Sequence, residues 1–227
     1  AWIITAASNG QIKRTPVRDF VVQRNNRVMP AMALGKDTEL LKAFVGYADD
    51  EIVLVSREGL ASRYPIGQIP VQGVKTRGVK AQNIVKGDRL VSVCSAGSNT
   101  ASLLITTEAG AMKRLKLEEI PANNRPSKGN LVAKKVKSNP NYISGIQKVA
   151  SGEILEFYDP EKQVLHAVDV PLKPAAATFS QPLVLKKGWY LKKEIEECRI
   201  VDTPEGADNE VHDDVEKLSL FDEDSGE

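Results

Sequence analysis

The sequence predicts an all-β protein, built from repeated four-stranded units of about fifty residues that are arranged around a common axis. Two observations predict this fold class. Short runs of apolar, β-branched residues recur along 1–201 and are separated by turns that contain glycine, which is typical of strands and hairpins. The same pattern also returns at a nearly constant spacing. A disordered acidic tail, residues 202–227, is expected to follow the β structure.

The repeated segment has an apolar strand, a glycine turn and a second strand that carries basic residues. The turn glycines Gly10, Gly59 and Gly110 are 49 and 51 residues apart. An apolar residue and a proline recur downstream, at 69–70, 120–121 and 170–171. Because proline cannot donate to a sheet ladder, each proline is expected to close a unit after its second strand. The predicted units lie near 1–36, 37–86, 87–139 and 140–201.

The fourth unit departs from the pattern. The run 154–157 leads into 159–162, where the turn glycine is missing, and Leu165-His166 stands where the basic pair is expected. Terminal repeats are often atypical because they cap an array. Residues 172–201 are therefore expected to complete and seal the last of about four blades.

The charges are strongly segregated along the chain. The formal net charge is only +1, with 31 basic and 30 acidic residues. Residues 202–227 hold eleven of the acidic residues and a single basic one, Lys217, which leaves 1–201 with a net charge of +11. A solvated surface is one reading of this basic body, but binding to nucleic acid is the commoner reason for such an excess.

Basic residues recur at fixed positions after the turn glycines. The pairs are Lys13-Arg14, Ser62-Arg63 and Lys113-Arg114, at the third and fourth positions. Side chains alternate across a strand, so only one member of each pair can face a given partner. Solubilising charge on an edge strand would also explain them. Arginine at the same offset in three repeats favours a role in binding.

A second recurrence follows each apolar-Pro pair. Residues 74–80 (Val-Lys-Thr-Arg-Gly-Val-Lys) align with 125–130 (Arg-Pro-Ser-Lys-Gly-Asn), and 23–27 (Gln-Arg-Asn-Asn-Arg) align less clearly. A hydroxyl, a cation and a glycine N–H are all donors that suit a phosphate. A turn glycine with incidental neighbours is the alternative. The candidate DNA-binding residues are Lys13, Arg14, Arg24, Arg27, Arg63, Lys75, Arg77, Lys80, Lys113, Arg114, Arg125, Lys128, Lys134 and Lys135.

The repeated strand–glycine–Lys/Arg–strand unit, with Thr-Arg-Gly-Val-Lys at 76–80, resembles the C-terminal domains of the A subunits of gyrase and topoisomerase IV, over roughly 1–201. The resemblance implies a β-pinwheel, a disc whose blades exchange strands and whose basic rim bends or wraps duplex DNA beside the catalytic core. Family members have five or six blades. Four units, in a chain that begins within a strand pattern and lacks an initiator Met, therefore lead us to expect about two more N-terminal blades in a longer protein.

The resemblance also implies partners and a location. The implied partners are duplex DNA, the catalytic part of the same A subunit and the ATPase B subunit. The implied location is the cytoplasm, next to the nucleoid. The resemblance implies no cofactor in this domain. Gyrase members carry a Gln-Arg-Arg-Gly-Gly-Arg-Gly box, and the nearest run here, 23–27, lacks both glycines. The degenerate loops and Lys-Lys-Val-Lys at 134–137 resemble topoisomerase IV more, and gyrase remains the alternative.

Catalysis by this chain is not expected. No tyrosine lies in an arginine–tyrosine cleavage context, and His166 and His212 lack the spacing of metal ligands. Cys94 and Cys198 are read as reduced thiols of a cytosolic protein, and no apolar run is long enough to span a membrane. Two alternatives of other classes are a propeller scaffold for protein partners and a propeller enzyme. The first would carry WD-type or kelch-type signatures, and none are present in the sequence. The second would need carboxylates that converge on the axis, and 49–51, the only acidic cluster of note before the tail, is read as a solvated turn.

The acidic tail suggests two further hypotheses. As a tethered polyanion, it is expected to fold over the basic surface and compete with DNA, with a solubilising end as the alternative. Its short apolar segment, 217–221, resembles the Leu-Ser-Leu-Phe core of peptides that dock on the bacterial sliding clamp. Leu218, Leu220 and Phe221 would make that contact, although Lys217 replaces the preferred leading Gln.

Overall fold

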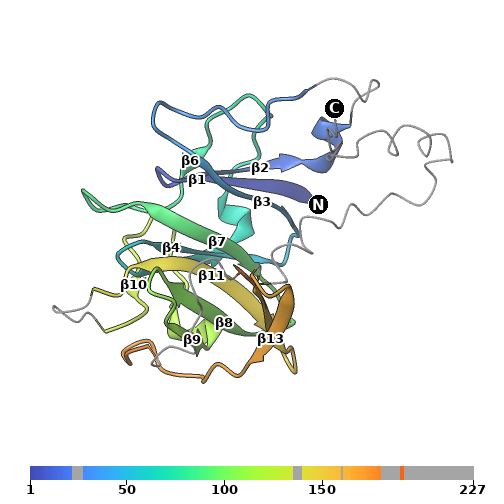
Figure 1. The fold of residues 1–227 in the computed structure, drawn as a ribbon. Helices are drawn as coiled ribbons and strands as arrows, with labels where there is room; N and C mark the ends of the chain where they lie inside the picture. The colour runs from blue at the N-terminus through green and yellow to red at the C-terminus, as the bar shows by residue number, and fades with distance from the viewer. Residues whose placement is uncertain (22–27, 135–139, 160, 180–189, 192–227) are drawn as a thin grey trace, which may run out of the picture.

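The computed structural model describes residues 1–21, 28–134, 140–159, 161–179 and 190–191. Within these ranges the protein is all-β, with strands β1 to β14 and three 3-10 turns, η1 (Val17–Phe20), η2 (Ile66–Gln68) and η3 (Leu117–Glu119). Figure 1 shows the sheets stacked in chain order, from the blue N-terminal sheet to the orange hairpin of the fourth. None of the helical turns in the described ranges is long and apolar enough to cross a membrane.

The first sheet, blade 1, is built around the β1–β2 hairpin and has the strand order β3-β1-β2-β6. Gly10 closes this hairpin with a φ of 82°, a backbone conformation that favours glycine. The two outer strands come from farther along the chain, beyond the first predicted unit. The bounds are β1 Trp2–Ala7, β2 Gln11–Pro16, β3 Leu40–Gly46 and β6 Val79–Lys80.

Blade 2 repeats the same arrangement, in the order β10-β5-β4-β7. Its hairpin again receives its outer strands from the following repeat, so each of these two blades is completed by its neighbour. This exchange of strands is the β-pinwheel that the resemblance implied. The bounds are β4 Glu51–Ser56, β5 Leu60–Pro65, β7 Leu90–Ala96 and β10 Asn130–Leu131.

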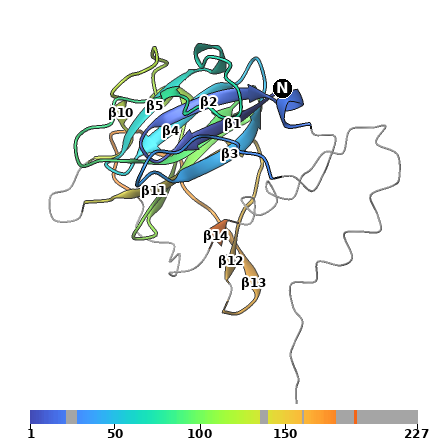
Figure 2. The same ribbon diagram turned by 90° about the horizontal axis from the view of Figure 1, so that it is seen from above.

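Blades 3 and 4 each have three strands among the described residues, in the orders β11-β8-β9 and β13-β12-β14. In Figure 2 the β12–β13 hairpin projects beyond the outline of the first three sheets. The bounds are β8 Thr100–Thr107, β9 Met112–Leu115, β11 Ile143–Ala150, β12 Leu155–Asp159, β13 Val164–Val168 and β14 Tyr190–Leu191.

The hydrophobic cores lie between successive blades. Along β4, Ile52 and Leu54 face blade 1, whereas Val53 and Val55 face blade 3, and all four are fully buried. The continuous apolar run of this strand follows directly from burial on both faces. A smaller cluster, which includes Leu104 and Phe157, joins blades 3 and 4.

The inner strands β3, β7 and β11 converge. Ser92 on β7 donates a hydrogen bond to the carbonyl of Ile146 on β11, at 3.2 Å. Lys42 on β3 reaches Gln147 on β11, with 3.2 Å between Nζ and Oε1. Blades 1 and 3 therefore meet across the inner side of blade 2, as expected for blades that turn about an axis.

Candidate nucleic-acid interface

Two loops carry five of the fourteen predicted DNA-binding cations. After η2 and after η3 the chain passes an apolar-Pro pair and crosses back to the preceding blade. Parallel bridges fix these crossings, between Arg14 and Val71 and between Arg63 and Ala122. We call residues 71–80 and 122–131 the first and second crossing loops. They end as the short edge strands β6 and β10, which pair with β2 and β5 respectively.

The glycine of each crossing loop is required by a close approach to the preceding blade. Gly78 and Gly129 have φ values of 88° and 87°. A Cβ at either position would lie 2.6 Å from a backbone oxygen, that of Ile12 or Ala61. These glycines therefore let the loop pack against the hairpin, which is a structural reason for their recurrence.

The hydroxyl of each loop is also used inside the protein. Thr76 donates to the carbonyl of Gly73 at 2.9 Å, and the hydroxyl of Ser127 lies 2.8 Å from that of Ser62. Of the hydroxyl, cation and glycine N–H predicted to bind phosphate, the hydroxyl is thus already hydrogen-bonded within the fold.

Four of the five cations in the crossing loops face solvent. Lys75, Arg77, Lys80 and Lys128 are exposed, and within the described part of the chain no side chain or carbonyl binds their charged groups. Lys134, just beyond β10, is exposed as well. The stretches 59–87 and 120–152, which contain both loops, have no aspartate or glutamate. The two loops therefore combine free cations with flanking sequence that lacks acidic residues.

The two crossing loops are joined directly. Arg125, half-buried, donates from Nη1 to the carbonyl of Lys80 at 2.7 Å and from Nε to that of Gln68 at 3.1 Å. The backbone N–H of Asn83 donates to the carbonyl of Ser127 at 2.8 Å. Arg125 therefore links the two neighbouring loops that carry Lys80 and Lys128.

The lysines on the hairpin strands do not reach that surface. Lys13 and Lys113 are fully buried, and their ammonium groups donate to backbone carbonyls. The acceptors of Lys13 are Gly73 and Val74, at 2.7 and 2.9 Å. We therefore withdraw both lysines from the DNA-binding set, because the face opposite the apolar position is covered by the crossing loop and not open to solvent.

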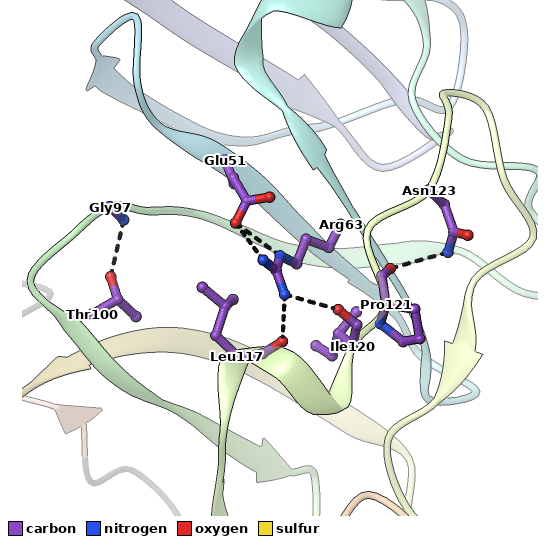
Figure 3. A network of polar contacts seen from close by, with 8 residues as sticks. All are labelled: Glu51, Arg63, Gly97, Thr100, Leu117, Ile120, Pro121 and Asn123. Carbon is purple, nitrogen blue, oxygen red and sulfur yellow. Dashed lines mark hydrogen bonds and ion pairs between the residues drawn. The ribbon is translucent and has the colours of Figure 1, made fainter.

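The arginines of the basic pairs are half-buried and join successive blades. Arg63 contacts Glu51 at 2.8 Å and donates to the carbonyls of Leu117 and Ile120 at 3.0 and 3.2 Å (Figure 3). Arg114 donates to the carbonyl of Val170 at 2.6 Å. Arg14 lies 3.5 Å from the carbonyl of Gly67 and stacks on Trp2. Each guanidinium thus holds the chain of the following unit.

Other predicted groups fall elsewhere. Arg24, Arg27 and Lys135 lie outside the described residues, as do the tail and its apolar segment. The acidic run 49–51 is used structurally, since Asp50 accepts the amide of Tyr47 and Glu51 pairs with Arg63. Among the residues that the structure describes, no cluster of three His, Cys, Asp or Glu side chains could hold a metal ion.

Comparison with known families identifies this architecture. The sequence model of the DNA gyrase C-terminal domain, a β-propeller, matches residues 1–45, 50–93 and 101–150. The chain belongs to this family. The match is to the C-terminal part of the gyrase protein and not to its catalytic core, in agreement with the prediction of a non-catalytic domain.

Relatives of the gyrase C-terminal domain family include components of both enzymes. The chain is 35% identical to the A subunit of DNA topoisomerase 4 from Streptococcus pneumoniae over 160 residues, 68% of this chain and 19% of that protein. It is 31% identical to the A subunit of DNA gyrase from Dehalogenimonas lykanthroporepellens over 165 residues, 73% of this chain and 19% of that protein. The chain thus spans about a fifth of the length of these relatives.

Solved structures of the family share the fold. The C-terminal domain of DNA topoisomerase IV matches with a TM-score of 0.72 at 23% identity, covering 81% of this chain and 57% of that one. The gyrase A C-terminal domain matches with a TM-score of 0.70 at 20% identity, covering 84% and 63%. The predicted β-pinwheel is therefore confirmed.

Proposed function

We propose that this domain binds duplex DNA along its crossing loops, without preference for base sequence. One observation carries the proposal. Arg77 and Lys128 occupy equivalent positions, 51 residues apart, in two successive crossing loops, and both are exposed with no internal partner among the described residues. Cations that the fold does not use, in stretches of sequence without acidic residues, are what contact with DNA phosphates requires.

The arrangement of the blades favours a bent path for the DNA. Blades that turn about an axis carry equivalent loops at successive angles. A duplex that contacts more than one loop must therefore curve, and the cost of bending has to be offset by the added phosphate contacts. Lys75 and Lys80 extend the first loop's contribution, and Lys134 that of the second.

We further propose that the chain is part of a topoisomerase IV A subunit, and that it presents bent or wrapped DNA to the catalytic part of that protein, in an assembly with the ATPase subunit beside the nucleoid. The relative from Streptococcus pneumoniae and the degenerate loop sequences support topoisomerase IV. The gyrase A subunit is the alternative, because the chain is also similar to gyrase proteins.

The binding proposal is tested by titrating a random-sequence duplex at several salt concentrations. If about six to ten phosphates are contacted, affinity should fall by roughly 10³ to 10⁵ between 50 and 200 mM salt. A second duplex of unrelated sequence should bind equally well. A flat salt dependence, or a strong preference for one sequence, would contradict the proposal.

Wrapping is distinguished from simple bending by DNA topology. A circular plasmid is relaxed by a nicking-closing enzyme in the presence of the domain, and the protein is then removed. A wrap of about a full turn leaves a change in linking number, whereas a bend leaves none. The domain should also shorten the time in which a short duplex is ligated into a circle, and unchanged circularisation would argue against bending.

A further inference from the structure

The residue three positions after each turn glycine points into the crossing loop of the following unit. In the first repeat this residue is Lys13, whose Nζ donates to the carbonyls of Gly73 and Val74. These two residues immediately precede Lys75 in the first crossing loop. A strand residue thus holds a loop that is sixty positions away in the sequence.

The same contact recurs in the other repeats with different chemistry. Lys113 donates to the carbonyls of Pro174, Ala175 and Ala177, at 3.0, 3.1 and 2.9 Å, and its ammonium lies 5.4 Å from the ring of Phe179. In the second repeat the position is Ser62, whose hydroxyl meets that of Ser127 at 2.8 Å. Three repeats therefore use the same position to fix the loop that crosses back onto the hairpin.

A buried ammonium is costly unless its protons are hydrogen-bonded. Among the residues that the structure describes, both lysines meet that need with backbone carbonyls, and no carboxylate is among their hydrogen-bond partners. The carbonyls of 73 and 74 are thereby turned inward, while Lys75 and Arg77 on the same loop are exposed.

We infer that Lys13 and Ser62 are positioning residues for DNA binding. Each one holds the crossing loop of the next unit in the conformation that displays its cations, without touching DNA itself. Lys113 makes the equivalent contact with residues 174–177, a segment without an exposed cation, and is therefore not included. A loop that is ordered beforehand loses less conformational entropy when it binds, so its cations contribute more to affinity. This inference rests on the proposed function of the crossing loops.

The test compares Lys13→Met with Arg77→Ala in the whole chain. Methionine replaces the unbranched apolar part of the lysine side chain and lacks the ammonium. Lys13→Met should weaken duplex binding on the order of tenfold, since the loop is no longer preorganised, and leave the salt dependence unchanged. Arg77→Ala should lower the slope of log affinity against log salt by about 0.9, as expected for one lost phosphate contact.

Amide hydrogen exchange gives a readout that does not depend on DNA. Lys13→Met should speed exchange within 73–78 and leave 123–130 unchanged. Ser62→Ala, a milder and uncharged variant, should do the reverse through the lost contact with Ser127. This pair of variants separates loop positioning from a general loss of stability, which would accelerate exchange in both loops.

Three results would overturn the inference. Lys13→Met would bind DNA as tightly as the unaltered chain, or it would lower the salt slope as much as Arg77→Ala, or its exchange would rise equally in both crossing loops. If the unaltered chain binds DNA in any of these cases, only the positioning role fails. If the unaltered chain does not bind duplex DNA at all, the proposed function and this role both fail.

Discussion

Arg63 and Arg77 are both arginines of repeated motifs, yet only one is available to a phosphate. The guanidinium of Arg63 already contacts Glu51 and two carbonyls, whereas Arg77 is exposed and unpartnered within the described residues. A guanidinium bound in this way would have to give up those bonds before it could contact DNA. The side chains at the third and fourth positions after the turn glycine are therefore components of the fold.

Replacing Arg63 should therefore affect stability more than DNA binding. Arg63→Met leaves Glu51 and two carbonyls without their partner, which should lower the free energy of unfolding by about 1 to 3 kcal/mol. Arg77→Met, the matched control, should leave it within about 0.5 kcal/mol. Urea denaturation of both variants measures this difference, and equal losses would show that Arg77 is structural too.

Lys113 gives the domain a pH-dependent stability. Burial, and then the charge of Lys173, lower the pKa of Lys113 from 10.5 to about 8. The unfolded chain keeps the ordinary pKa, so between about pH 8 and 10.5 it binds more protons at this residue than the folded chain. The free energy of unfolding should accordingly rise with pH across that window.

Comparing urea denaturation of the unaltered chain and of Lys113→Met at pH 8 and pH 10 isolates this contribution. The rise should be larger in the unaltered chain, because methionine has no proton to lose. The same pH dependence in both proteins would mean that the pKa of Lys113 is not lowered in the folded state.

At the scale of elements, the crossing loops depend on the close approach of Gly78 and Gly129 to the hairpins. Gly78→Ala places a Cβ 2.6 Å from the carbonyl oxygen of Ile12, at a positive φ. We expect it to lower stability by about 2 kcal/mol or more. Gly73→Ala, in the same loop, meets no atom within 4 Å and should be nearly neutral. Thermal denaturation compares them, and a neutral Gly78→Ala would contradict the packing described for this loop.

The hairpins could be predicted from the sequence, but the exchange of strands could not. Gly10, Gly59 and Gly110 mark the turns because a hairpin imposes a local requirement that repeats with the unit. In contrast, β3 lies in the second predicted unit and yet pairs with β1 of the first. Such pairing depends on the three-dimensional path of the chain, and two-residue edge strands such as β6 carry no alternating pattern.

The sequence predicts the exposed cations of the crossing loops, but it does not predict that the lysines on the hairpin strands are buried. Arg77 and Lys128 stand out because a cation recurs before a glycine at a spacing of 51 residues. Lys13 is expected at the surface because a lysine is rarely buried. Its partners are backbone carbonyls, which every residue has, so no sequence signature marks them. One sequence feature could have revealed the burial of Lys13. The second repeat has Ser62 at the equivalent position, whereas a position that contacts phosphate would be expected to carry a cation in every repeat.

At the scale of the whole molecule, the basic body and the acidic tail carry opposite charges. Residues 1–201 have a net charge of +11 and 202–227 a net charge of −10. If the tail competes with DNA for the basic surface, removing 202–227 should tighten duplex binding, most strongly at low salt where electrostatic attraction is least screened. A chain whose tail carboxylates are replaced by amides serves as the length-matched control and should behave like the truncation.

Binding titrations below 100 mM salt decide this prediction about the tail. Unchanged affinity after truncation would show that the tail does not cover the crossing loops. The proposed sliding-clamp contact is separate, and is tested by titrating the clamp with a tail peptide and with its Leu220→Ala/Phe221→Ala variant. Equal signals from both peptides would end that proposal.

On the whole domain, the exposed cations of the crossing loops are proposed to bind DNA phosphates together. The most direct test is the salt dependence of duplex binding by the double variant Arg77→Ala/Lys128→Ala. Its control is Lys116→Ala/Lys162→Ala, which removes two exposed lysines outside the crossing loops. If both loops contact phosphates, the double variant should lower the slope of log affinity against log salt by about 1.8, and the control should leave it unchanged. Equal slopes for the two double variants would contradict the account.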